Sequence, residues 1–369
     1  MDAISGEVPI LKYKSGATEL FDRLRAFYMR QADNRIFATM EVPNQSLARF
    51  RSEHTEGECV APDPDERAEF WDRYLAERAA VEDDSLPVAY LSEMDQGLYG
   101  GLLGGDVRFM CHPENGWISS MVPPLLDDLD QFDVLRFDRS HPWWQRYIEQ
   151  MKIFAEKSRG KWGVSHFILI DGLNFVFELI GGTQTYLNLY DRPDWIRRAI
   201  DFAFDLNVAV QEAFFEAIPP TAGGTFSNFA QWIPGRIVSE SIDPFHMTSV
   251  EDFETWGREP VERILNHFDG GVIHIHGNGR HLLESAATIR GLVALLLLDD
   301  RGYPLAFDIV NELKQKVGDL PISLFAPYEA FAERLERRDL PGGVFYQVQG
   351  VPDLATAERL MEKVRAYRV

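Results

Sequence analysis

Cysteine, excess positive charge and long hydrophobic runs are all scarce in this sequence, and each shortage excludes a class of protein. The 369 residues contain only Cys59 and Cys111, which form no metal-type cluster. The formal net charge of −21 leaves no basic excess for binding nucleic acid or an anionic membrane. The longest apolar run, residues 292–298, is far too short to span a bilayer, and residues 1–16 lack a secretory signal pattern. We therefore expect a protein of the reducing cytoplasm with a small-molecule substrate.

Short apolar runs alternate with helical patterns along most of the chain. We expect strands at 36–42, 87–95, 165–171, 223–228, 271–275, 292–298, 322–326 and 343–349. Helices are expected between them, for example at 192–217 and 250–268. Eight strand-to-helix units of this kind imply a parallel sheet, and a TIM (β/α)8 barrel is the simplest arrangement. A doubly wound sheet is the main alternative.

Some segments fall outside this repeating pattern. Residues 16–31 predict an N-terminal helical extension, and insertions at about 45–86 and 97–164 follow the first and second strands. The second insertion contains a hairpin candidate with its turn at 113–116 and an aromatic-rich helix at 142–158. We expect all of these to belong to one domain that spans residues 1–369.

Most of the predicted strands end in polar side chains. These are Glu41, Glu93, Asp95, Asp171, Asn228, His274, His276, Asp299, Asp300, Gln347 and Gln349. In a barrel the carboxyl ends of the strands share one rim, where active sites lie. The convergence of acids and histidines predicts a functional site at that rim.

The stretch Gly271-Val-Ile-His-Ile-His-Gly-Asn-Gly279 places two histidines at the end of a buried strand. His274 and His276 are two residues apart, so they project from the same face and can supply two nitrogen ligands to a metal. A catalytic zinc needs a third protein ligand from another strand end. Our first choice is Glu240, and weaker candidates are Asp243, Asp299 and Cys111. The alternative is a pair of ordinary core histidines bonded to carboxylates.

Further candidates are polar or aromatic residues near the strand ends. Asp171 and Asn174 follow a strand so apolar that a polar residue must face the rim or cap the next helix. The candidate catalytic residues are Asp171, Asn174, Asp243 and Glu93. The candidate cofactor-binding residues are Trp232 and Asn278. Trp117, Trp232 and Phe175 are candidates for an aromatic pocket, although aromatic residues of this kind also fill ordinary cores.

Between about residues 165 and 290 the chain resembles the uroporphyrinogen decarboxylase superfamily. The matching segments are Phe177-Glu-Leu-Ile-Gly-Gly182, Leu189-Tyr-Asp-Arg-Pro-Asp-Trp195, Ser239-Glu-Ser-Ile-Asp243 and Phe268-Asp-Gly-Gly-Val-Ile-His-Ile-His-Gly-Asn278. This superfamily is a group of TIM barrels that includes porphyrinogen decarboxylases and cobalamin-dependent methyltransferases. The resemblance therefore implies a barrel with one of these two chemistries.

In the methyltransferase branch the corresponding strand carries a His-x-Cys-Gly motif that binds zinc together with a later cysteine. Here His274 matches the histidine, His276 stands where the cysteine would be, and no cysteine follows Cys111. The resemblance thus implies a divalent metal, with zinc as first choice, held by nitrogen and oxygen ligands.

The decarboxylase branch requires cationic residues near the first strand to hold a polycarboxylate. Arg35, in the segment 29–35, superficially matches that requirement, but it precedes the first strand and suits an ordinary turn. The acidic strand ends would also repel a polycarboxylate.

Three hypotheses follow from these observations. The first is a metal-dependent, methyltransferase-like enzyme that acts on a small methylated substrate with a corrinoid carrier protein. The second is a decarboxylase-like lyase in which Asp171, Asp243 or a histidine transfers the proton. The third is a non-catalytic barrel that binds a corrinoid or a small amine, because an acidic, aromatic rim suits a cation. The resemblance is compatible with a monomer or a homodimer.

Overall fold

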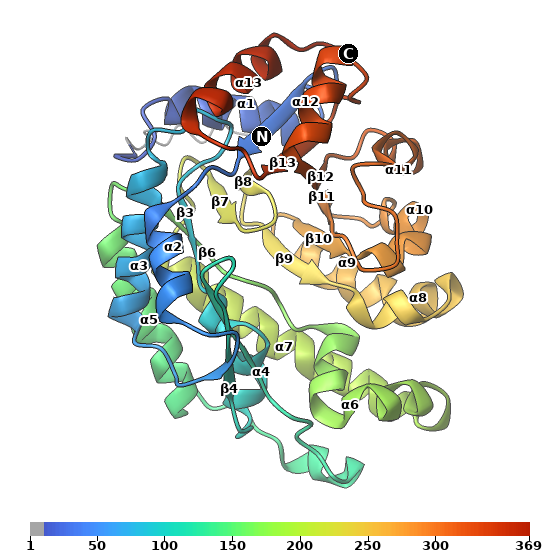
Figure 1. Cartoon of the computed structure of the whole chain (residues 1–369). Coiled ribbons are helices and arrows are strands. Elements are labelled where there is room, and N and C mark those ends of the chain that lie inside the picture. The colour runs from blue at the N-terminus through green and yellow to red at the C-terminus, as the bar shows by residue number, and fades with distance from the viewer. Residues whose placement is uncertain (1–10) are drawn as a thin grey trace.

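A six-stranded parallel sheet forms the centre of the computed structural model, which describes residues 11–369 (Figure 1). Its strand order is β1-β13-β12-β11-β10-β9. The strands are β1 (Ile36–Met40), β9 (Val238–Ser241), β10 (Gly271–Ile275), β11 (Leu292–Leu297), β12 (Ile322–Pro327) and β13 (Val344–Gln349). The order runs from β9 to β13 and then to β1, without the reversal of a doubly wound sheet. This confirms an α/β fold built on a parallel sheet.

Helices alternate with the strands along the chain. They are α1 (Ala17–Tyr28), α2 (Gln45–Glu53), α3 (Pro64–Arg78), α4 (Gln96–Leu102), α5 (Pro142–Ser158), α6 (Gly172–Asp191), α7 (Pro193–Ala217), α8 (Val250–Trp256), α9 (Arg258–His267), α10 (Leu283–Ala286), α11 (Val310–Val317), α12 (Tyr328–Arg337) and α13 (Leu354–Ala366). The last helix, α13, packs against β1, so the end of the chain lies beside its first strand (Figure 1). Within residues 11–369, no helix is long and apolar enough to cross a membrane.

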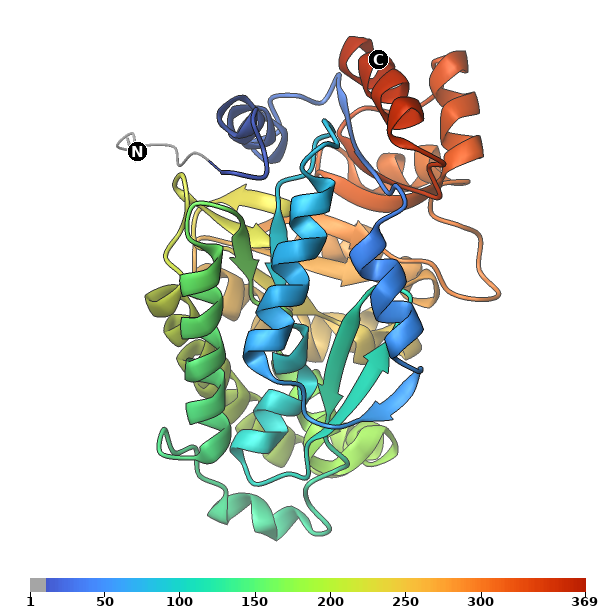
Figure 2. The same cartoon turned by 60° about the vertical axis from the view of Figure 1, so that its left-hand side comes forward.

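Three smaller sheets surround the central one. They are the parallel pair β3 (Val88–Tyr90) and β6 (Gly163–Ser165), the antiparallel pair β7 (Gly224–Ser227) and β8 (Gln231–Pro234), and the sheet of β2 (Gly57–Cys59), β4 (Arg108–His112) and β5 (Trp117–Met121). The predicted hairpin is confirmed as β4 and β5. Figure 2 shows its sheet beside α2 and α3.

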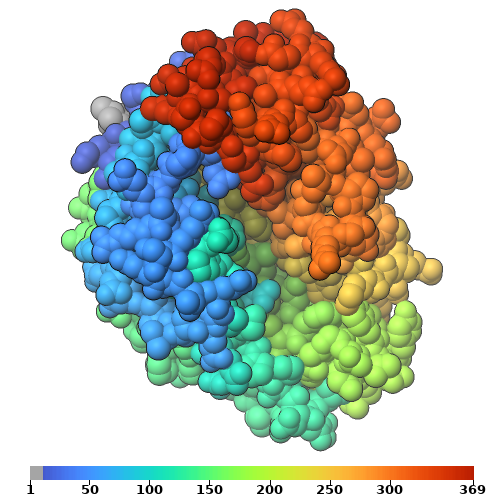
Figure 3. Space-filling view, viewed as in Figure 1, coloured from blue at the N-terminus to red at the C-terminus, as the bar shows by residue number. Residues whose placement is uncertain are grey.

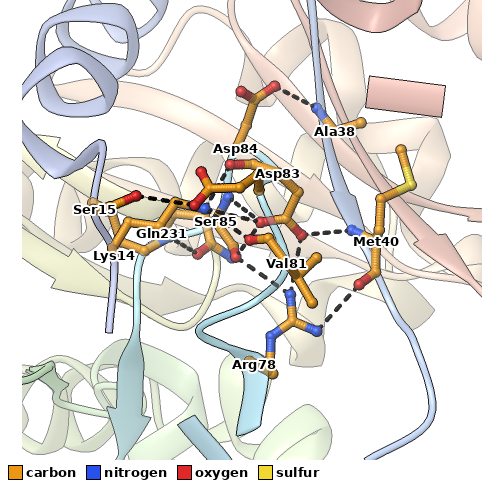
Figure 4. Close-up of polar contacts among 12 residues, drawn as sticks. Lys14, Ser15, Ala38, Met40, Arg78, Val81, Asp83, Asp84, Ser85 and Gln231 are labelled. Carbon is orange, nitrogen blue, oxygen red and sulfur yellow. Dashed lines mark hydrogen bonds and ion pairs between the residues drawn. The ribbon is translucent and has the colours of Figure 1, made fainter. Parts of the chain in front are cut away.

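Two aspartates cover the edge of β1 that faces away from β13. Asp84 accepts a hydrogen bond from the Ala38 N–H (3.0 Å) and donates its own N–H to the Ala38 carbonyl (2.9 Å). Asp83 accepts from the Met40 N–H at 2.8 Å (Figure 4). These carboxylates satisfy backbone donors that a neighbouring strand would otherwise satisfy.

Asp83 is also the centre of a buried ionic network (Figure 4). Its carboxylate lies 3.0 Å from Arg78 and 3.4 Å from Lys14. Burial raises the pKa of Asp83, but the two cations together with hydrogen bonds from Ser85 and Met40 lower it by more, so the group remains ionised. The network therefore holds the segment between α3 and β3 against the edge of β1.

On the other side of the sheet, the segment after β6 contacts β9. The Leu169 N–H donates to the Ser239 carbonyl at 2.9 Å. Together with the Asp84 contacts, this hydrogen bond extends the backbone pairing at both edges of the six-stranded sheet. Closure into an eight-stranded barrel stays a prediction.

Several local predictions differ from the structure. The strand expected at 165–171 is replaced by β6, which ends at Ser165, and residues 166–171 form no strand. The strand expected at 87–95 ends at Tyr90, and Glu93 lies in a 3-10 helix, Ser92–Met94. The strand expected at 223–228 is confirmed as β7, but it pairs with β8 in a hairpin, and β9 lies beside β10 in the central sheet. The helix expected at 250–268 is divided at Gly257, where a Cβ atom would lie only 2.6 Å from the Phe253 ring.

Candidate functional site

A cavity of about 560 Å³ lies at the carboxyl ends of the central strands. In Figure 3 the molecule is hollowed between its blue N-terminal part and its orange C-terminal part. The polar residues from strand ends that line the cavity are Glu41, Asp95, Asn228, Asp243, His274, Gln347 and Gln349. All of these except Asp243 belong to the predicted polar strand ends, and their side chains line one cavity.

The strand β10 brings both histidines to one side. The ring centroids of His274 and His276 are 5.3 Å apart, and the His274 side chain is buried. Asp243 follows β9 at the start of the 3-10 helix Asp243–Met247, and its Oδ1 lies 3.0 Å from His274 Nε2. Asp243, His274 and His276 each offer one ligand atom, and these atoms all lie within 4.8 Å of one another.

Asp300 orients His276. One of its carboxylate oxygens lies 3.0 Å from His276 Nδ1, and the other accepts the Asn278 N–H at 3.2 Å. A carboxylate on one imidazole nitrogen fixes the ring and leaves the other nitrogen for a metal. The neighbouring Asp299 has a structural role, because it binds Arg280 at 2.9 Å and the Ala306 N–H at 2.6 Å.

A third histidine, His246, also contacts Asp243. Its Nδ1 lies 3.5 Å from Asp243 Oδ1, and its ring centroid is 5.7 Å from that of His276. A Cβ atom on Gly279 would be 2.1 Å from the His246 ring, so this ring position requires glycine at 279. His246 was not predicted, because nothing in the spacing of residues 243–247 relates it to His274 and His276.

The local electrostatics favour a carboxylate among imidazoles. Burial raises the pKa of Asp243, but His274, His246 and His276 lower it by more, to about 2. Burial lowers the pKa of His246 to about 4, so this imidazole is neutral at pH 7. Metal ligands have to be deprotonated, and both groups meet that requirement.

The donor set of Asp243, His274 and His276 fits a divalent metal. Two imidazoles and one carboxylate form a three-ligand set of the kind that holds catalytic zinc, and they also suit iron, manganese or cobalt. Oδ1 of Asp243 lies 3.0 Å from His274 Nε2, whereas the other ring nitrogen of His274, Nδ1, is buried without a hydrogen-bond partner. A buried polar atom in that state is costly unless a cation or another group reaches it.

Glu240, the first choice for the third ligand, lies in a different group. In the parallel register Glu240 is opposite Ile273, and Ser241 is opposite His274. Partners in register point to the same face, so Glu240 points away from the histidine face. The structure therefore favours Asp243, the second candidate, as the residue beside the histidines.

Glu240 instead joins two of the predicted catalytic residues. It lines a small cavity of about 10 Å³ together with Asp171 and Asn174. Burial raises the pKa of both carboxyl groups, and the Asn174 side chain donates to the Ser241 carbonyl at 2.7 Å. This group is separate from the large cavity, whose lining includes neither carboxylate.

Glu93 and Trp232 also lie away from the cavity wall. Glu93 is buried, forms an ion pair with Arg67 and accepts a hydrogen bond from Gln150 at 2.9 Å. Trp232 packs against Phe21 in the core and donates its indole N–H to the Thr221 carbonyl at 2.9 Å. Both side chains thus have structural partners that account for their burial.

The remaining aromatic and amide candidates divide between the core and the site. Phe175 is fully buried in the core, whereas Trp117 lines the cavity. Asn278 supports Asp300 through its backbone N–H, and its side-chain oxygen is buried without a hydrogen-bond partner.

The comparisons with known proteins give a structural relative only. No family model matches the chain, and no curated protein matches it. The resemblance to the uroporphyrinogen decarboxylase superfamily therefore stays a prediction. The structure is similar to that of a methyltransferase from Methanosarcina mazei, with a TM-score of 0.60 and 15% sequence identity. The match covers 94% of this chain and 98% of that chain, which shows a shared fold over nearly the whole length.

Proposed function

We propose that this protein is a metal-dependent, methyltransferase-like enzyme that acts on a small methylated substrate, with a corrinoid-bearing protein as its partner. The observation that carries the proposal is the group Asp243, His274 and His276, which gathers beside a 560 Å³ cavity at the carboxyl ends of parallel strands. The fold shared with a methyltransferase supports the choice of reaction class.

Each part of the site has a task in this proposal. Asp243, His274 and His276 would hold the metal, and Asp300 fixes the His276 ring. A bound zinc ion would act as a Lewis acid on a heteroatom of the substrate. Asp95 lies on the cavity wall, and burial raises its pKa to about 8, so it holds a proton at pH 7. Asp95 can therefore protonate the heteroatom that loses its methyl group.

The charges on the cavity wall disfavour the lyase alternative. Arg78 is the one lysine or arginine among the described residues that line the cavity, and Asp83 already neutralises it at 3.0 Å. Arg35 lies at the amino end of β1 and is exposed there, away from the carboxyl-end cavity. A substrate with several carboxylates would find no free cation on this wall.

Metal analysis of the purified protein tests the proposal. After dialysis against zinc, elemental analysis should find about one equivalent per chain, because the three side chains form a single site. His274→Ala and Asp243→Ala should lose the bound metal. Glu240→Gln and His54→Ala, which alter residues outside the group, should retain it. A wild-type protein that binds no added zinc, cobalt or manganese would refute the proposal.

A further inference from the structure

Four aromatic rings form a continuous row along the cavity. They are Trp71 from α3, Tyr90 from β3, Trp117 from β5 and Phe167, which follows β6. Their successive ring centroids are 5.2, 5.9 and 5.2 Å apart, and their planes meet at 72°, 86° and 87°. The cavity thus has a wall of rings that meet nearly at right angles. We call these four residues the aromatic wall.

The aromatic wall differs from ordinary core packing in its exposure. Tyr90, Trp117 and Phe167 are only partly buried, although the largest aromatic side chains of the core are fully buried. Aromatic rings that line a cavity can offer their electron-rich faces to a bound group, and such faces attract cations. Four segments that are distant in sequence supply the rings, so the tertiary fold holds the wall in place.

The charges around the aromatic wall also favour a cation. The acidic residues Glu41 and Asp243 line the same cavity. The one guanidinium on the cavity wall within residues 11–369, that of Arg78, is held by Asp83 and by the Met40 carbonyl. A net charge of −21 further attracts cations to the molecule.

We propose that the aromatic wall binds a methylated ammonium group, so that the substrate is a small compound that carries such a group and, separately, a heteroatom with a lone pair for the metal. The identification as a substrate rests on the proposed function, whereas the binding of the cation does not depend on a metal. An experiment can therefore refute cation binding by the aromatic wall without refuting metal binding, and the reverse.

Calorimetry with two matched probes tests this inference. Choline carries a trimethylammonium group, and 3,3-dimethyl-1-butanol is its uncharged isostere with the same shape. Choline should bind roughly tenfold more tightly than the isostere, because only the cation gains from the ring faces and the acids. Metal content is measured on the same samples, so loss of metal and loss of the cation preference can be told apart.

Variants of the aromatic wall provide the second arm of the test. Trp117→Ala and Tyr90→Leu should lose the preference for choline, and Trp117→Phe should retain most of it because a ring remains. Trp143→Phe is the matched control, since Trp143 lies outside the cavity lining. Thermal melts establish that each variant folds. Equal binding of choline and the isostere overturns the inference. An unchanged preference for choline in folded Trp117→Ala also overturns it. So does stronger binding of methoxybenzene, an uncharged methyl ether, than of choline.

Discussion

The contact between Asp300 and His276 determines which nitrogen of the His276 ring is left free to face Asp243 and His274. The carboxylate lies 3.0 Å from Nδ1 and holds the ring through that atom. Loss of such a supporting carboxylate typically costs about 10- to 100-fold in metal affinity. We therefore expect Asp300→Asn to bind zinc 10- to 100-fold more weakly in a competitive chelator titration. Asp308→Asn, at an exposed position, is the control, and equal affinity in the two variants would contradict the assignment.

Gly279 allows His246 to approach the turn that follows β10. Gly279 has no side chain, and an added Cβ atom would lie only 2.1 Å from the His246 ring. Gly279→Ala should displace this ring and reduce the free energy of unfolding by about 1–3 kcal/mol, as overpacking does. Urea unfolding measures the effect. Gly16→Ala is the control, because a Cβ atom there meets nothing within 4 Å; an equal loss in both variants would exclude a steric cause.

At the scale of single elements, residue periodicity predicted the apolar strands but missed one polar strand. The strand β10 was found because Val272, Ile273 and Ile275 are β-branched and apolar. In β9, three of the four residues are polar, namely Ser239, Glu240 and Ser241, yet all are buried. Ser239 contacts the Ser227 hydroxyl at 3.4 Å, and Ser241 accepts the Asp243 N–H at 3.3 Å; periodicity does not reveal such contacts.

Because periodicity does not reveal contacts between distant segments, only part of the candidate site could be predicted from the sequence. His274 lies in β10, and His276 follows the end of that strand in an extended conformation, so their common face follows from the backbone geometry alone. Asp243 and Asp300 reach them only through the pairing of β10 with β9 and β11. Polar strand ends therefore indicated where the site lies, and the register between strands determined which carboxylates meet the histidines.

The edge of β1 depends on Asp83. This carboxylate is fully buried, accepts the Met40 N–H and neutralises both Arg78 and Lys14. Asp83→Asn should lower the free energy of unfolding by about 3–5 kcal/mol, because removing one member of a buried ion pair leaves the other charge unpaired. Chemical denaturation measures this change.

A surface ion pair provides the control for that prediction. Asp319 pairs with Arg30 at 2.9 Å, but the Asp319 side chain is 70% exposed. Asp319→Asn should therefore change the free energy of unfolding by less than about 1 kcal/mol. Similar losses of unfolding free energy in the two variants would show that the stability contributed by the Asp83 network does not depend on its burial.

At the scale of the whole molecule, buried ionisable groups make stability depend on pH in two directions. Burial lowers the pKa of His166 to about 3, so folding keeps this imidazole neutral and stability is lost as pH falls below about 6.5. Burial raises the pKa of Glu178 well above its usual value, so the folded state keeps this carboxyl protonated. The contribution of Glu178 to the free energy of unfolding is therefore present at low pH and is lost as pH rises above about 4.3.

Glu178 allows the alkaline side of this dependence to be measured. Both of its carboxylate oxygens are buried without a hydrogen-bond partner, so ionisation inside the protein is costly. Glu178→Gln cannot ionise, and the decline in its free energy of unfolding between pH 5 and pH 8 should be shallower by up to about 1.4 kcal/mol per pH unit. Urea unfolding across that range gives the slopes. Glu284→Gln, at an exposed position, should have the wild-type slope. If Glu178→Gln also has the wild-type slope, then Glu178 is ionised in the folded protein and an unseen partner satisfies it.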